Sequence, residues 1–266
     1  MHLGTTGVGG FSRNLIAAAV IAICGTAAAQ TGPNKVYLEQ IGSSNTITIE
    51  QVGATNNVGG TAGNVSVDGT GVTTLTPSAP SSGNYATVTG SNNVIVINQT
   101  GSNNSAQYNI TGSNNTYNST ITGDNNQTRL IMGSGNVVAN YNTVTETVAG
   151  SNNLIMQNIQ ASNVVSTTNI TGSTNQVTKD LSSNRGNSNV TISGNNNVIT
   201  AEQTGVAGAA GHSLINTVTG DYNSITTQQQ GSIDTTVNLQ TTGSFNTITV
   251  RSSDTAIVNP KTAIQR

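Results

Sequence analysis

The feature that most constrains this chain is a tetrapeptide, Gly-Ser/Asp-x-Asn, that returns at intervals of eleven residues. Four consecutive copies begin at Gly90, Gly101, Gly112 and Gly123. Glycine and asparagine both tolerate a positive φ, so each copy predicts a tight turn. The predicted turn glycines are Gly42, Gly53, Gly90, Gly101, Gly112, Gly123, Gly150, Gly172, Gly194, Gly220 and Gly243.

Between the turns the residue types alternate with a period of two. After the first turn, Asn45, Ile47, Ile49 and Gln51 lie two residues apart, with Thr46, Thr48 and Glu50 between them. A period of two is the period of a β-strand, so the first set shares one face and the second set points the other way. Each unit is therefore predicted to be a strand of about seven residues and a turn of about four.

One such unit has no partner against which to bury its inner face, whereas two units facing each other make a rung of about 22 residues. The composition fits a thin core, because only 7% of residues are charged and 3% aromatic. We therefore predict an all-β fold, a two-sheet β-solenoid or cross-β stack of about eight rungs.

Asparagine and glutamine at equivalent places in successive rungs are expected to hydrogen-bond along the stack as ladders. The Gln-x-Gly endings at Gly101, Gly205 and Gly231 fall on alternate units. The predicted ladder residues are Asn45, Gln51, Asn93, Gln99, Asn197, Gln203, Asn223 and Gln229.

The organisation along the chain follows from the repeat and its interruptions. Residues 1–29 are predicted to be a secretory signal peptide, with an apolar run after Arg13 and small residues before Gln30, so the mature protein is expected outside the cell. The first repeat units are expected over residues 30–58, an irregular loop over 59–83, the main array over 84–253 and a tail over 254–266. Cys24 is the only cysteine, so no disulfide is available after removal of the leader.

Several positions break the pattern. Shorter irregularities lie at residues 133–142, where Ala139-Asn-Tyr-Asn142 resembles a premature turn, and at residues 205–212. Glu146 and Lys179 fall on the inward face, which indicates either an error in the assigned register or rungs that are open at an edge.

The sequence predicts no catalytic, metal or cofactor site, and hence no enzyme. His212, with Ser213 and Asp221 nearby, is the one hydrolase-like grouping, and nothing in the spacing enforces a catalytic geometry. Acidic residues are scattered rather than clustered, as a metal site would require. Without Arg13 the chain has seven basic and ten acidic residues, which argues against nucleic-acid binding, and the apolar run is too short for membrane insertion.

The unit Asn-x-Ile-x-Ile-x-Gln-x-Gly, preceded by a Gly-x-x-Asn turn, resembles the curlin repeat of bacterial amyloid fibre subunits. The similarity covers residues 36–53 and most of 84–252, although only about five units end in Gln-x-Gly. The resemblance implies a secreted subunit that assembles with itself end to end into fibres for adhesion or biofilm matrix. It also implies a nucleator or an outer-membrane export factor as further partners.

Two other functions fit the same pattern. A solenoid with capped ends would serve as a monomeric or trimeric adhesin or appendage fibre, including one carried on a phage particle. Outward Thr-x-Thr pairs such as Thr46/Thr48 resemble the flat threonine arrays of ice-binding solenoids, but equivalent positions read Val94/Val96 and Gln107/Asn109.

Overall fold

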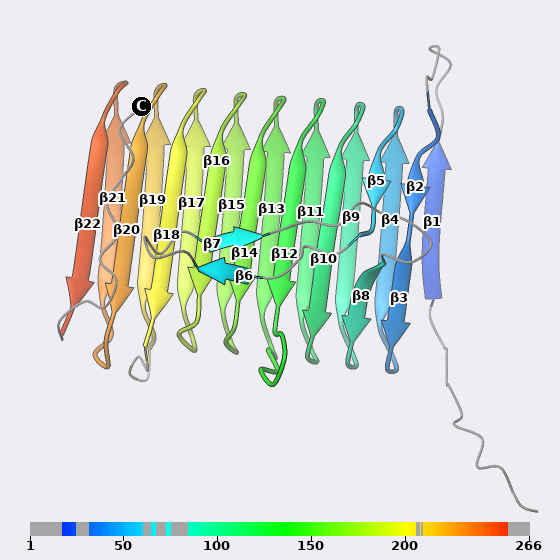
Figure 1. Ribbon diagram of the computed structural model, residues 1–266, viewed down its shortest axis with the longest axis horizontal. Helices are drawn as coiled ribbons and strands as arrows, with labels where there is room; N and C mark the ends of the chain where they lie inside the picture. The colour runs from blue at the N-terminus through cyan, green and yellow to red at the C-terminus, as the bar shows by residue number, and fades with distance from the viewer. Residues whose placement is uncertain are drawn as a thin grey trace, which may run out of the picture.

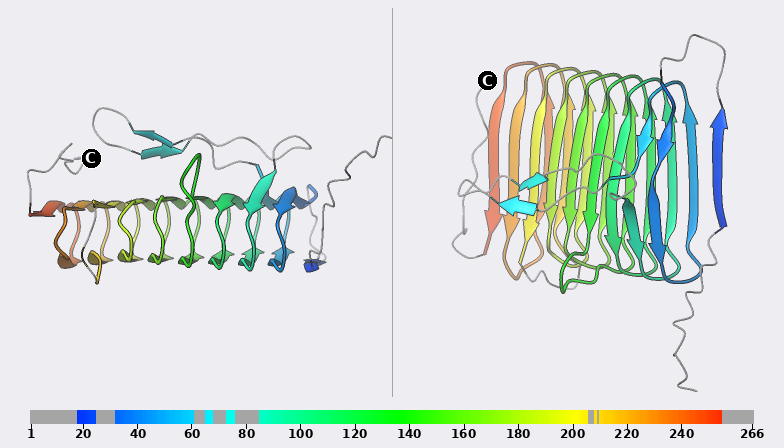
Figure 2. Two further views of the ribbon diagram at one scale, coloured as in Figure 1. Left: turned by 90° about the horizontal axis from the view of Figure 1, so that it is seen from below. Right: turned by 45° about the vertical axis from the view of Figure 1, so that its right-hand side comes forward.

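The computed structural model describes residues 18–24, 32–60, 65–67, 73–75, 85–205, 208 and 210–254, with the backbone alone for 18–24, 65–67 and 73–75. These residues form a two-sheet β-solenoid in which all strands of both sheets run parallel to their neighbours, and they contain no helix (Figure 1). The predicted fold class is therefore confirmed. The two sheets lie face to face as a flat rod with about eight rungs (Figure 2).

Sheet A has nine strands and sheet B eleven. In spatial order, sheet A contains β1 (Ala18–Cys24), β4 (Thr46–Val52), β9 (Val94–Thr100), β11 (Thr116–Thr122), β13 (Thr143–Ala149), β15 (Val165–Thr171), β17 (Asn187–Ser193), β19 (Ser213–Thr219) and β21 (Thr236–Thr242). Sheet B contains β2 (Lys35–Val36) with β3 (Leu38–Ile41), β5 (Asn57–Val58) with β8 (Ala86–Thr89), then β10 (Ser105–Thr111), β12 (Gln127–Met132), β14 (Leu154–Ile159), β16 (Gln176–Leu181), β18 (Val198–Thr204), β20 (Ser224–Gln230) and β22 (Thr247–Ser253).

The chain alternates between the sheets, so each strand pairs with the strand one rung later in the sequence. Where the repeat is regular, the in-register partner lies two repeat units further along, as between β13 and β15. The spacing is wider between β11 and β13, where Thr116 pairs with Thr143, and between β17 and β19. Longer corners absorb the extra residues, and the sheet register is kept.

Most of the corners that open with glycine share one backbone conformation. The glycine that opens the corner and the third residue both have positive φ, for example +112° to +149° at Gly112, Gly150 and Gly243 and about 58° to 60° at Asn103 and Asn114. All eleven predicted turn glycines have positive φ. A Cβ on Gly150 would lie 1.9 Å from the carbonyl oxygen of Gly172 in the next rung, so stacked corners leave no space for a side chain there.

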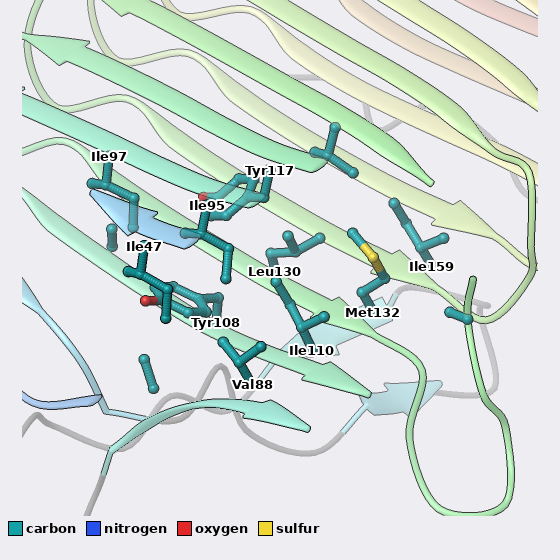
Figure 3. Packing of buried hydrophobic residues seen from close by; sticks show 14 of the residues in the cluster. Ile47, Val88, Ile95, Ile97, Tyr108, Ile110, Tyr117, Leu130, Met132 and Ile159 are labelled. Carbon is teal, nitrogen blue, oxygen red and sulfur yellow. The ribbon is translucent and has the colours of Figure 1, made fainter. Parts of the chain in front are cut away.

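The core is the thin layer between the sheets. Inward side chains such as Ile47, Ile95, Ile110 and Leu130 are fully or almost fully buried (Figure 3). Tyr108 and Tyr117 meet edge to face across this layer, with ring centroids 5.8 Å apart. The predicted inward face, with Asn45, Ile47, Ile49 and Gln51 on the same side, is the buried face of β4.

The irregular segment after residue 58 is an insertion into a single strand. Asn57 of β5 pairs with Ser105, and Thr87 of β8 pairs with Asn109, so β5 and β8 lie end to end against the same strand, β10. Within the insertion, β6 (Val65–Val67) and β7 (Thr73–Leu75) form an antiparallel pair that lies over the outer face of sheet B (Figure 2). The remaining residues of the loop predicted over 59–83 lie mostly outside the described part of the chain.

Both predicted terminal segments also fall largely outside the described residues. Within the predicted leader, residues 18–24 form β1, which pairs in parallel with the outer edge of β4. The predicted cleavage position at Gln30 is not among the described residues. Of the predicted tail, only Asp254 is described, directly after β22.

Candidate functional site

The most extensive polar arrangement is a continuous row of asparagines at the corners that lead from sheet A to sheet B. Each member from Asn56 onward is the fourth residue of its corner. In each interior step, the side-chain oxygen accepts the backbone N–H of the next asparagine, as Asn153 Oδ1 accepts from Asn175 N at 2.9 Å. This row, the long ladder, consists of Asn34, Asn56, Asn104, Asn126, Asn153, Asn175, Asn197, Asn223 and Asn246.

The side-chain amide of each ladder residue also ties neighbouring corners together. Asn153 Nδ2 donates to the carbonyl oxygen of Gly172 at 2.8 Å, and it lies 3.1 Å from Asn126 Oδ1. The interior members from Asn56 to Asn223 are at most 2% exposed. The ladder therefore satisfies the carbonyl groups of the glycine corners, which a buried turn would otherwise leave without partners.

A shorter row occupies the opposite corners. This short ladder consists of Asn45, Asn93, Asn115 and Asn142. The row ends at Asn142, whose Oδ1 accepts from the backbone N–H of Val164. In the later rungs the equivalent positions are occupied, in order, by Val164, Gly186, His212 and Thr235.

The eight predicted ladder residues lie in these rows or in glutamine pairs, and all are buried. Gln51 Nε2 donates to Gln99 Oε1 at 2.8 Å in sheet A, and Gln203 Nε2 donates to Gln229 Oε1 at 2.9 Å in sheet B. The predicted alternation of Gln-x-Gly units was therefore wrong beyond residue 133, because the long connection after β12 contains a single corner, preceded by the additional residues 133–138. That corner is Ala139–Asn142, so the apparent premature turn is a regular one.

The remaining long-ladder asparagines were not predicted as ladder residues. The available signal was the fourth position of the Gly-x-x-Asn tetrapeptide, which was predicted as a ladder position only at Asn45, Asn93, Asn197 and Asn223. In the structure the third residue adopts the left-handed conformation, and the fourth is the buried, hydrogen-bonded one.

A second polar cluster crosses the core at the middle rungs. Glu146 on β13 accepts from the Tyr117 hydroxyl at 2.9 Å and from Gln157 Nε2 at 2.7 Å. Lys179 Nζ on β16 donates to Ser166 Oγ, and to the carbonyl oxygens of Thr167 and Ser188 at 2.7 and 3.0 Å. Ser166 Oγ in turn donates to Gln157 Oε1, which joins the two halves.

Both charged groups are buried, at 1% exposure for Glu146 and 0% for Lys179. The assigned register was therefore correct at these residues, and the expectation of an open edge there was wrong. Burial lowers the pKa of Lys179 to about 7, against the opposing influence of Glu146. Burial likewise raises the pKa of Glu146, while the hydrogen bonds from Gln157 and Tyr117 act in the opposite direction.

The hydrogen bonds of His212 and Asp221 go to other partners, so they do not assemble the hydrolase-like grouping. The ring of buried His212 contacts the Thr204 carbonyl oxygen at 3.2 Å and the Thr235 hydroxyl at 2.9 Å. Asp221 instead accepts from the backbone N–H of Asn195 at 2.6 Å. Within the described ranges, no group of three or more His, Cys, Asp or Glu side chains is placed to hold a metal ion.

The outward rows of sheet A are chemically mixed. The column that contains Thr48 continues with Val96, Asn118, Thr145, Thr167, Asn189, Ile215 and Asn238. A threonine array of the ice-binding kind needs the same residue in rung after rung, and this column does not supply it.

The third polar feature is the unpaired backbone N–H and C=O groups along the strand edges at the two ends of the rod. In the described part of the chain, β21 and β22 have a neighbouring strand on one side only, and so do β2 and β3 at the other end. Inward residues of the last rung, such as Leu239 and Ile248, are only partly buried, in contrast to their interior counterparts.

Comparison with protein-family models, with curated proteins and with solved structures finds no significant match to this chain. In the described residues, no helix is long and apolar enough to cross a membrane.

Proposed function

We propose that this chain is a non-enzymatic structural subunit of the curlin-repeat type that is secreted and assembles end to end into extracellular fibres for adhesion or biofilm matrix. The observation that carries the proposal is the pair of open ends. In the part of the chain that the structure describes, each end presents unpaired parallel strand edges in line with the axis along which the rungs already stack (Figure 1).

The contacts between neighbouring rungs in the interior support a structural function, because the same contacts would hold stacked copies together. Inward positions are filled by side chains that pack or hydrogen-bond to the next rung, from Ile95 and Ile97 to the amides of Asn104 and Asn126. A new rung added at an end would gain the same backbone pairing and the same amide contacts. Growth by addition of copies therefore uses interactions that every interior rung already makes.

The experiment is to purify the exported protein and follow thioflavin fluorescence with time, then to record fibre diffraction. We expect fluorescence growth and a meridional reflection at about 4.7–4.8 Å with an equatorial spacing of about 10 Å. A protein that stays monomeric at high concentration over days would contradict the proposal.

One observation favours the competing function of a capped adhesin or appendage protein. β1 covers the outer edge of β4, so one strand edge of sheet A is occupied in the chain as described. A chain that keeps this strand and elutes as a single monomeric or trimeric species in size-exclusion chromatography would support the competing function.

A further inference from the structure

The two ends of the rod are stepped rather than flat. At the C-terminal end, the last strand of sheet B, β22, lies beyond the last strand of sheet A, β21 (Figure 2). At the N-terminal end the step is reversed, because β1 extends sheet A beyond β4, and sheet B begins at β2 and β3 (Figure 2). In a chain that keeps residues 18–24, two such ends are complementary in outline when one copy follows another along the axis.

The strand register shows which residues would face each other at that junction. Residues of successive sheet B strands form columns, and the column of Thr247 leads back through Ser224, Ser105 and Asn57 to Lys35. The column of Arg251 likewise leads back to Glu39. Continuing each column into a second copy therefore sets residues 35–41 against residues 247–253.

The residue types match along this junction. Val36 and Leu38 fall opposite Ile248 and Val250, and all four lie on the inward, partly buried side. On the outward side, the carboxylate of Glu39 falls opposite the guanidinium of Arg251. Apolar residues thus meet apolar residues, and the one pair of outward charges is of opposite sign.

An unsatisfied buried atom points to the same partner. Gln40 Oε1 is buried without a hydrogen-bond partner. Gln40 lies on the inward face, in the column that ends at Ser252. The hydroxyl of Ser252 in a neighbouring copy is a donor of the kind that this oxygen lacks.

We propose that a second copy of this chain docks its Lys35–Ile41 edge on β22, parallel and in column register. The proposal rests on the fibre function proposed above and specifies the interface between subunits.

The long ladder gives this interface a direction. Every interior asparagine oxygen accepts from the following rung, and Asn246 is the last member in the described chain. The residue that follows it in column is Asn34 of the second copy, the first member of its own ladder. In the same corner as Asn246, Phe245 is 73% exposed and stacks on Tyr222, with ring centroids 5.1 Å apart. The next position in the column of Phe245 is Pro33 of the second copy.

The C-terminal corner is also open where interior corners are closed. A Cβ on Gly220 would lie 2.2 Å from the Gly243 carbonyl oxygen, whereas a Cβ on Gly243 meets only Asn246 Nδ2, at 3.6 Å. The surface at Gly243 therefore has the shape of an interior corner whose next rung is missing.

In a chain that keeps residues 18–24, sheet A completes the junction with β1. When β22 of the first copy pairs with residues 35–41 of the second copy, sheet A has room for one strand between β21 of the first copy and β4 of the second. β1 lies on that level, and Ala19 and Ile21 share the columns of Val237 and Leu239. The contact in sheet B is the same with or without β1, because it involves only β22 and residues 35–41.

Charge reversal tests the register. We expect E39R and R251E each to raise the protein concentration that remains soluble beside fibres roughly three- to tenfold, because each places like charges opposite each other. The double variant E39R/R251E restores opposite charges, and its soluble concentration should return to that of the unmodified chain. R185E, at an exposed corner in the middle of the rod, is the charge-matched control and should have no effect.

Disulfide trapping tests the same contact covalently, in the full chain with Cys24→Ser. K35C/T247C should give a reductant-sensitive ladder of covalent multimers, because in-register strands lie at a distance that a disulfide spans. I41C/T247C, six residues out of register, should not cross-link.

The outcomes separate the interface from the function. Cross-linking by I41C/T247C alone would overturn the parallel register, and so would fibres that form but show neither cross-link nor charge rescue. Failure of the unmodified chain to form cross-β fibres would instead contradict the proposed function itself.

Discussion

At each corner that leads from sheet A to sheet B, a buried asparagine compensates for the polar backbone that the stacked glycines expose. Glycine is required because a Cβ would collide with the next corner, and its carbonyl oxygen is then enclosed within the stack. Asparagine supplies both a donor and an acceptor on one short side chain, so a single residue type satisfies the corner above and the corner below.

Replacement of one ladder asparagine should therefore destabilise the chain far more than replacement of its neighbour. Asn153→Ala removes the acceptor of the Asn175 N–H and the donor to the Gly172 carbonyl oxygen. We expect the free energy of unfolding to fall by about 2–4 kcal/mol, measured by urea denaturation. Asn152→Gly is the matched control, because Asn152 is exposed and has positive φ, which glycine adopts readily. Equal losses in the two variants would contradict the assigned function of the ladder.

The sequence predicted half of this residue-level arrangement. Asn45 and Gln51 could be assigned to the inner face because they continue the alternation of Ile47 and Ile49. Asn104 and Asn126 are the last residues of the same tetrapeptide, but the strands after them lack the Ile-x-Ile-x-Gln pattern that marks the inner face after Asn45, and the turn motif alone does not reveal where its last side chain points. That choice depends on how corners stack, which is a property of neighbouring rungs.

Between elements, the Glu146–Lys179 cluster joins strands of both sheets in the middle of the rod. Along β14 and β16, apolar residues flank the polar ones, as Ile155 and Ile159 flank Gln157. The three acceptors around Lys179 Nζ match the three hydrogens of an ammonium group. Burying these charges is costly, so the cluster favours one register of β13 against β16 rather than adding stability.

The lowered pKa of Lys179 predicts a pH dependence of stability with a definite sign. Between about pH 7 and its usual pKa of 10.5, the unfolded chain holds the Lys179 proton and the folded chain has lost it. The unfolded state then binds more protons, so the free energy of unfolding rises with pH across this window. Urea midpoints of the unmodified chain and of K179M should accordingly diverge from pH 7 to pH 10, in favour of the unmodified chain. A constant difference would show that Lys179 does not titrate in that range.

The split strand β5–β8 gives a second prediction at the level of elements. Deletion of residues 59–84 joins Val58 to Tyr85 and restores one continuous strand in register with β10. We expect a folded rod, more stable by on the order of 1–2 kcal/mol because no loop has to be closed. Deletion of 59–83 is the control, since the one residue left over reverses the inward and outward faces. The far-ultraviolet spectrum and the urea midpoint of both variants provide the measurement.

Strand identity and strand order were predictable because they depend on period and interval alone. The assignment of units to sheets was not predictable beyond residue 133. The connection from Met132 to Thr143 contains additional residues as well as a corner, and a count of residues does not show which of them form the corner. Lys179 was uncertain for a related reason, since its burial depends on partners from β15 and β17.

As a whole molecule the rod is one-dimensional, because each rung contacts only the rungs above and below it. Its stability is therefore expected to be a sum over rungs and their interfaces, with no single centre on which folding depends. The same property makes an added copy equivalent to added rungs, which connects the stability of the monomer to the proposed fibre.

Duplication of one rung tests this property directly. A second copy of residues 94–115 inserted before Thr116 adds one complete rung and preserves every column, including the contact of Tyr117 with Glu146. We expect a higher melting midpoint and a rod longer by about 4.8 Å in small-angle scattering, because the new rung repeats native pairings. The same insert without Ile97 is the control, since the missing residue turns Gln99 to the outward face and should lower the midpoint. If the complete duplication is as destabilising as this control, rungs are not interchangeable, and growth by addition of identical rungs loses its physical basis.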